Sequence, residues 1–340
     1  MIGFGQLTYV PDSIFENYLE THTSNGMLCV VGSPWSMGNG IGNDSNVFTS
    51  AISLVTLLDF SWDNISDLTG VEDFISLTHL YCDFNNLTSL NVSQNTALTY
   101  LYCGYNQLTN LDVSNNTSLF WLSCGSNNLT SLDVNNNILL SFLSCDYNYQ
   151  ITSLDVSNNI NLNVLYCNNI AIGALDVSNN TDLNFLNCSF NWLSTLDVSN
   201  NTSLNVLSCH SNQLTSLDVS NNTALYRLDC QSNQLISLDV KNGNNQNFSY
   251  FISIGNPNLS CINVDDVAWS ASNWTVASGN IDTQHYFSNN CSGTAIEEYA
   301  KNKEPLRIID ILGRESKPKK NQPLFYLYSD GAIEKKIINK

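Results

Sequence analysis

Apolar and polar residues alternate along most of the chain in runs of about four positions, which is the period of a β-strand. The runs recur as a unit that reads L-x-x-L-x-C-x-x-N-x-L-T-S-L-D-V-S-N-N-T-x and is seen from Leu98 to Thr117. No window carries an apolar stripe at helical spacing that is long enough for a substantial helix. The pattern therefore predicts a mainly β fold with few helices.

Cysteine marks the period of this unit. Eight cysteines follow one another at intervals of 21 residues, with a single interval of 22: Cys82, Cys103, Cys124, Cys145, Cys167, Cys188, Cys209 and Cys230. A fixed period of this size is typical of a repeat solenoid. Because one half of each unit carries cysteine and the other valine, we expect two short parallel strands per turn. The longer interval contains one extra residue within Tyr147–Ile151, which a loop can absorb.

Asparagine marks the predicted corners. It occurs three residues after the repeated valines from Val92 to Val219, and three residues after each ladder cysteine except Cys167, where Ile170 takes its place. Its amide can bond backbone groups that a strand leaves unpaired, and asparagine tolerates a left-handed backbone. We expect an asparagine ladder at each corner, with a local irregularity at Ile170.

The unit matches the leucine-rich repeat pattern L-x-x-L-x-L-x-x-N-x-L, with cysteine or valine in the third apolar slot. The chain resembles a group of bacterial secreted leucine-rich repeat proteins whose units read much like LTSLDVSNNTALTYLYCGYNQ. In this resemblance Tyr9–Leu19 looks like the amino-terminal cap, and Asn256–Cys261 with Trp274 looks like the carboxy-terminal cap. A short helix is expected around Asp12–Glu20, with Asp12 or Ser13 as its N-cap.

The resemblance implies a division of the chain into five parts. Residues 1–6 are interpreted as a signal-peptide remnant, although a genuine cytosolic start is the alternative. An amino-terminal cap is expected over 7–60, the solenoid over 61–254, a carboxy-terminal cap over 255–295 and a sorting domain over 296–340, for which the residues are given below. The stretch Met37–Ser45 is glycine-rich, but it lacks the flanking strand and helix of a phosphate loop and is interpreted as an ordinary flexible loop.

The last 45 residues differ in charge from the rest. Residues 1–295 hold two basic and 23 acidic residues, whereas residues 296–340 hold ten basic and seven acidic ones. Three strand-like runs are predicted there, at Leu306–Leu312, Leu324–Ser329 and Ala332–Ile338, with Asp330-Gly331 as a hairpin signal. The segments Ile309–Arg314, Pro323–Gly331 and Glu334–Ile338 resemble the carboxy-terminal sorting domain of type IX secretion cargo. That resemblance implies export by the type IX machinery and a secreted or outer cell-surface location.

Charge and composition exclude several function classes. The formal net charge of −18 argues against nucleic acid as a partner, because phosphate binding needs clustered lysine and arginine. No apolar run is long enough to span a membrane. The four histidines are scattered and no catalytic motif occurs, so the chain is predicted not to be an enzyme and to need no cofactor.

Two columns of reactive side chains have simple interpretations. The ladder cysteines alternate inward with leucine, which favours a buried core over disulfides or metal. Cys261 and Cys291 lie outside the ladder and are a plausible disulfide in an exported protein.

The residue before each repeated valine is acidic in seven turns: Asp112, Asp133, Asp155, Asp176, Asp197, Asp218 and Asp239. Bonding to neighbouring serine and threonine hydroxyls is favoured over calcium binding, since each turn offers too few oxygens.

The outward positions of the cysteine-side strands are chemically varied and rich in aromatic residues. We predict a ligand-binding face there, made by Tyr81, Tyr100, Tyr102, Trp121, Phe142, Tyr166, Phe185 and His210. Contiguous exposed aromatic rows are unusual without a partner, although aromatic residues also suit cross-strand packing. The sequence therefore predicts a non-enzymatic protein that binds a protein or glycan. The alternative is a structural or self-associating surface protein.

Overall fold

The structure is a computed structural model that describes residues 6–291, 307–309, 314–317, 323–327 and 333–337. The chain falls into two compact units, residues 1–289 and residues 290–340. The interpretation of residues 1–6 as a signal-peptide remnant concerns residues of which only Gln6 is described. Of the three segments that resemble a sorting domain, residues 310–313, 328–331 and 338 also lie outside the described residues.

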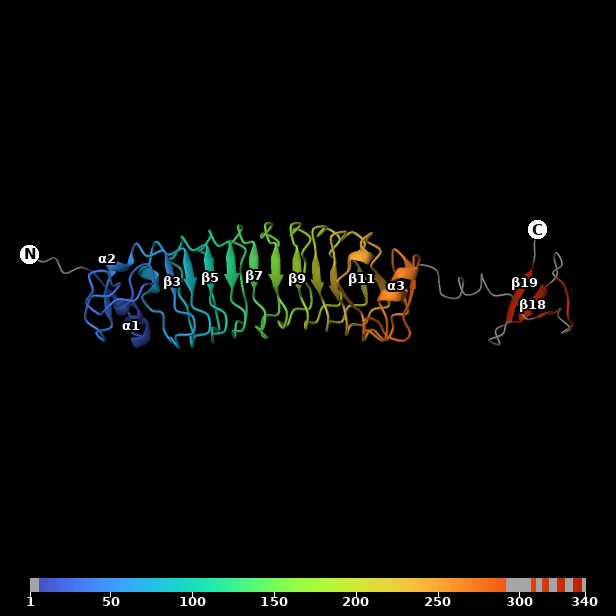
Figure 1. Ribbon diagram of the computed structural model, residues 1–340, viewed down its shortest axis with the longest axis horizontal. Coiled ribbons are helices and arrows are strands. Elements are labelled where there is room, and N and C mark those ends of the chain that lie inside the picture. The colour runs from blue at the N-terminus through green and yellow to red at the C-terminus, as the bar shows by residue number, and fades with distance from the viewer. Residues whose placement is uncertain (1–5, 292–306, 310–313, 318–322, 328–332, 338–340) are drawn as a thin grey trace, which may run out of the picture. The chain divides into compact units, whose positions relative to one another are not determined.

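The first unit is a solenoid whose turns each contribute one strand to a parallel sheet of ten (Figure 1). Neighbouring strands are in register, so equivalent residues of successive turns stand side by side. The strands are β3 (Leu57–Asp59), β4 (His79–Tyr81), β5 (Tyr100–Tyr102), β6 (Trp121–Ser123), β7 (Phe142–Ser144), β8 (Val164–Tyr166), β9 (Phe185–Asn187), β10 (Val206–Ser208), β12 (Arg227–Asp229) and β14 (Tyr250–Ile252). The predicted β-solenoid is confirmed.

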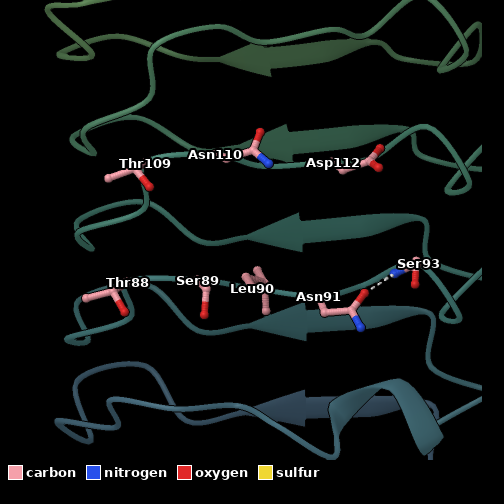
Figure 2. Close-up of a pocket in the computed structure, with 8 residues that line it drawn as sticks. All are labelled: Thr88, Ser89, Leu90, Asn91, Ser93, Thr109, Asn110 and Asp112. Carbon is pink, nitrogen blue, oxygen red and sulfur yellow. Dashed lines mark hydrogen bonds between the residues drawn. The ribbon is translucent and has the colours of Figure 1, made fainter.

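The second strand of each turn is more restricted than expected. A parallel sheet on the valine side forms only near the carboxy-terminal end, from β11 (Ser216–Asp218), β13 (Ser237–Asp239), β15 (Cys261–Asn263) and β16 (Tyr286–Ser288). In the early turns a shallow groove of about 230 Å³ opens between the valine-side segments around Asn91 and Asp112 (Figure 2). Backbone groups there bond side chains: Ser114 N–H donates to Asp112 of its own corner, and Val92 O accepts from the amide of Asn116 in the next turn.

The eight ladder cysteines lie in the core. Each is free and completely buried, beside the leucines and valines of the same turns. Burial raises the pKa of every one of these thiols, in the case of Cys188 to about 12. A buried thiol that stays protonated at neutral pH is a poor nucleophile. The core interpretation of the ladder is confirmed.

The cysteine-side asparagines tie each turn to the one before it. Asn127 is representative: its Nδ2 donates to Cys103 O at 3.0 Å and to Cys124 O at 3.1 Å, while its Oδ1 accepts from Leu108 N at 2.9 Å. In the turn of Ile170 this link is missing, and Ile151 N donates to the backbone oxygen of Asn148 instead. The irregularity expected at Ile170 is therefore present.

The left-handed backbone is not at the asparagine itself. It is at the residue before it, where φ lies between 51° and 55° in eight successive turns: Phe84, Tyr105, Ser126, Tyr147, Asn169, Phe190, Ser211 and Ser232. Non-glycine residues at such φ are uncommon, and the conformation costs about 1 kcal/mol or more per residue. In seven of these turns a buried asparagine follows and bonds the neighbouring backbone, whereas Asn169 adopts the same conformation before Ile170.

The amino-terminal end covers the first turn of the solenoid. It contains β1 (Leu7–Tyr9) paired antiparallel with β2 (Asn46–Phe48), helices α1 (Ser13–Thr21) and α2 (Thr49–Ile52), and a 3₁₀ turn, η1 (Val71–Asp73). Asp12 caps α1, as expected, by accepting from the N–H groups of residues 14 and 15. The glycine-rich loop is anchored rather than free: buried Glu20 accepts from Asn39 N and Gly40 N, and buried Glu16 accepts from Asp44 N.

The carboxy-terminal end of the solenoid is closed by η2 (Asn245–Asn247), by α3 (Val267–Asn273), and by buried Trp274, which stacks on Phe251 at 4.1 Å. Cys261 and Cys291 are both disulfide-bonded. The second unit contains three antiparallel strands, β17 (Arg307–Ile309), β18 (Pro323–Leu327) and β19 (Ile333–Ile337). These strands confirm the three predicted runs, whereas the Asp330-Gly331 turn lies outside the described residues.

Candidate binding face

Alternation along each cysteine-side strand buries the central leucine and turns the flanking residues outward. Strand β5 shows the pattern: Leu101 is buried, and Tyr100 and Tyr102 are half-exposed. Because the strands are in register, the outward side chains form two rows that run across the sheet. The row that begins with His79 is mainly aromatic through strand β9, and the row that begins with Tyr81 mixes tyrosine with serine and asparagine.

Ring contacts join these side chains into one surface, which we call the aromatic strip: His79, Tyr81, Tyr100, Tyr102, Trp121, Phe142, Tyr166 and Phe185. The tightest contact is between Trp121 and Phe142, whose ring centres are 3.6 Å apart and whose planes differ by 3°. Tyr102 also lies against Trp121, at 5.9 Å. The strip therefore crosses six strands without a break, from β4 to β9.

The structure brings together seven of the eight residues predicted for the ligand-binding face. His210 is the exception, because it lies after strand β10 in a different row and contacts the ring of Phe190 edge-on at 4.8 Å. His79 belongs to the strip although the prediction omitted it; its position in register with Tyr100 was the available signal.

Two glycines and two aspartates border the strip. Gly104 and Gly125 occupy the outward position after the ladder cysteine in adjacent turns, with Asp83 before them and Asp146 after them. A Cβ on Gly125 would lie 2.6 Å from a side-chain oxygen of Asp146, so a larger residue there would displace the Asp146 carboxylate. Burial raises the pKa of the Asp83 and Asp146 carboxyls. At Asp146 a hydrogen bond from the hydroxyl of Ser144 partly offsets this rise in pKa.

A polar cluster lies beyond the strip. Arg227 is 4.6 Å above the ring of Tyr250, whose hydroxyl donates to Asp229 at 3.4 Å. Arg227 is one of two basic residues in the first 295, and its contact with Tyr250 could not be read from the sequence, since residue 250 follows the last regular turn.

The opposite, valine side carries the acidic column in a uniform arrangement. Asp112 is typical: its Oδ1 accepts from Ser114 N at 2.9 Å, and hydrogen bonds from the hydroxyl and the backbone of Ser114 lower the pKa of the Asp112 carboxyl. The carboxylates of Asp155, Asp176 and Asp197 likewise accept a hydrogen bond from the backbone N–H of the serine two residues later. Each of these aspartates thus stabilises the turn in which it lies. Among the described residues, no group of three or more His, Cys, Asp or Glu could hold a metal ion.

Comparison with known proteins agrees with this geometry. A stretch of 45 residues is 47% identical to internalin J of Listeria monocytogenes serotype 4b (strain F2365), and this match spans 13% of the chain and only 5% of that protein. Among solved structures, the internalin InlF of Listeria monocytogenes is 17% identical over 84% of this chain and 97% of that chain, with a TM-score of 0.51. The chain is a leucine-rich repeat protein.

A second solved structure is similar to this leucine-rich repeat protein in sequence. It is the functional domain of InlJ from Listeria monocytogenes, which includes a cysteine ladder, and it is 31% identical over 78% of this chain and 68% of that chain, with a TM-score of 0.46. No family model matches the chain. None of the helices described here is long and apolar enough to cross a bilayer.

Proposed function

We propose that this leucine-rich repeat protein is a non-enzymatic binding module whose ligand, a protein, docks on the aromatic strip. The unbroken ring contacts from β4 to β9 are the observation that carries the proposal. The surface of a monomeric protein in water rarely carries a large contiguous apolar patch unless a partner binds there. Rigid aromatic side chains supply large contact area at a small cost in entropy and are enriched in the energetic centres of protein interfaces.

Charge indicates what kind of protein surface would fit. The strip is bordered by Asp83 and Asp146 and belongs to a region with two basic and 23 acidic residues. A partner with an apolar centre and lysine or arginine at its rim would be complementary. The two faces of the solenoid also differ, because the strip changes from turn to turn whereas the acidic column repeats. That contrast favours specific binding over the alternative of a packing or self-associating module, which needs uniform faces.

Site-specific photo-cross-linking tests this proposal. A photoreactive residue at Ser123, which is in register with Tyr102, keeps every ring of the strip and should capture a protein from host or bacterial surface extracts. The matched control is the same residue at Asp133, on the valine side of the following half-turn. Capture of one saturable protein partner only from position 123 supports the proposal. Capture of a second copy of this chain would support the self-associating alternative, and retention on a glycan array without protein capture would contradict a protein ligand.

We also propose that the protein is exported by type IX secretion and acts outside the cell. The resemblance of Glu304–Lys340 to sorting domains supports this, together with the three antiparallel strands described there. Deleting Glu304–Lys340 in a type IX-competent host should retain the protein in the cell envelope and leave thermal unfolding of the solenoid nearly unchanged, since repeats contact only their neighbours. Normal export of the truncated chain would contradict the sorting function.

A further inference from the structure

Three successive turns break the repeat at one position. Four residues after the ladder cysteine, the regular turns carry an amide side chain: Asn86, Gln107, Asn128, Gln213 and Gln234. The turns in between differ: Tyr149 takes this place in the turn with the inserted residue, where Gln150 follows it, and Ala171 and Trp192 replace the amide in the next two turns. The same stretch contains the single inserted residue and Ile170 in place of the corner asparagine. Three departures at one place in an otherwise regular array point to a local role.

The departures create a groove at the corner that follows the strands. It has a volume of about 470 Å³, and its lining includes Tyr149, Ile170, Ala171, Phe190 and Trp192. The three aromatic side chains are largely exposed, at 66% for Tyr149, 52% for Phe190 and 62% for Trp192. Ile170 is buried between these turns and forms an apolar floor, beside the small side chain of Ala171.

The spacing of the walls sets the size of the ligand. Tyr149 and Trp192 belong to turns two apart, which corresponds to about 10 Å at the spacing of parallel strands. A ligand in contact with both walls lies about 4 Å from the carbon atoms of each. The opening over Ala171 therefore admits one ring but not a folded peptide. An amide side chain at position 171, as in the regular turns, would occupy this space.

The polar part of the lining determines the chemistry of the ligand. It consists of amides and hydroxyls, including Asn169, Ser211 and Gln213, and no acidic or basic side chain lies among the residues that line the groove. An ionic ligand would find no counter-charge there. A ligand with several hydroxyl groups would find both donors and acceptors, and its C–H faces would pack on the aromatic rings. We propose that this groove binds one ring of a neutral saccharide.

The saccharide site is independent of the aromatic strip and does not rest on the proposed protein ligand. The strip lies on the outward face of the cysteine-side strands, whereas the groove lies at the corner beyond them. Three aromatic side chains can also surround a quaternary ammonium group, and choline is therefore the competing ligand to include in the test.

Isothermal titration of the intact protein with cellohexaose, maltohexaose, N-acetylchitohexaose and choline tests the site. At least one oligosaccharide should bind with a stoichiometry of one, and Trp192→Ala should weaken it at least tenfold. Ala171→Gln, which restores the amide of the regular turns, should weaken it to a similar extent. The matched control Tyr105→Ala removes an exposed ring from a regular turn and should change nothing. Unchanged thermal unfolding of each variant shows that the solenoid is intact.

Several outcomes would overturn the proposal. Absence of binding by all three oligosaccharides at millimolar concentration, or binding of choline alone, would reject a neutral saccharide. Equal losses in Trp192→Ala and Tyr105→Ala would reject the groove as the site. Loss of saccharide binding on Trp121→Ala, with Trp192→Ala unaffected, would place the saccharide on the aromatic strip instead.

Discussion

Replacing Trp121 and Tyr102 together by alanine is expected to weaken binding of the partner captured at position 123 by at least about a hundredfold. Trp121 stacks on Phe142 and touches Tyr102, so the two substitutions remove the centre of the aromatic strip. A ring at the centre of an interface contributes about 2 kcal/mol when truncated, and about 1.4 kcal/mol corresponds to a tenfold change in affinity. Each substitution alone should therefore weaken binding by tenfold or more, measured by titration of purified partner.

The control for this pair lies on the opposite side of the solenoid. Replacing Asp176 and Asp197 by asparagine changes two exposed valine-side side chains whose amide oxygens can still accept from the following serine. This variant should bind the partner as the unaltered protein does. A large loss from the aspartate pair, with none from the aromatic pair, would mean that the valine side is the binding surface.

Replacing Asn127 by alanine is expected to lower the free energy of unfolding by about 3 kcal/mol, because a buried polar group without a partner costs about 1–3 kcal/mol. The substitution leaves Leu108 N and Cys103 O without the bonds at 2.9 and 3.0 Å that join two turns. It also removes the support for the left-handed residue before it, Ser126. Equilibrium unfolding in denaturant measures the loss.

A neighbouring asparagine provides the matched control. Asn128 is exposed, and its backbone N–H donates to Leu108 O, a bond that alanine keeps. Asn128→Ala should change the free energy of unfolding by less than about 0.5 kcal/mol, as is usual for a surface position. If Asn127→Ala were no more destabilising than Asn128→Ala, the asparagine ladder would not be what joins the turns.

Much of the fold was predictable because the sequence repeats. The 21-residue period determines the solenoid, and alternation within each half-unit correctly places Leu101 and Cys103 in the core and Tyr102 outside it. The aromatic strip follows from the same register, since equivalent residues of adjacent turns must be neighbours. His210 was misplaced because it is one residue past its cysteine, where the chain has already begun to turn.

Other features depend on contacts that a repeat pattern does not contain. The valine side could not be predicted in detail, because the same Ser-Leu-Asp sequence forms a strand at Ser216–Asp218 but no strand in the earlier turns. The anchoring of the glycine-rich loop by Glu16 and Glu20 joins residues far apart in an unrepeated segment. The groove at Trp192, in contrast, did leave a signal: a comparison of turns at the fourth residue after cysteine shows the departure at once.

The asparagine ladder has a genetic consequence. Asn127 and its equivalents bond only their own turn and the turn before it, and every regular turn makes the same bonds. An in-frame gain or loss of one regular turn would therefore join two surfaces that already fit. A change in the number of regular turns would keep these bonds, while the irregular turns around Ala171 cannot be exchanged for a regular one without losing the groove. Only the part of the aromatic strip on β4 to β6 can therefore change in length without disturbing the turns that form the groove.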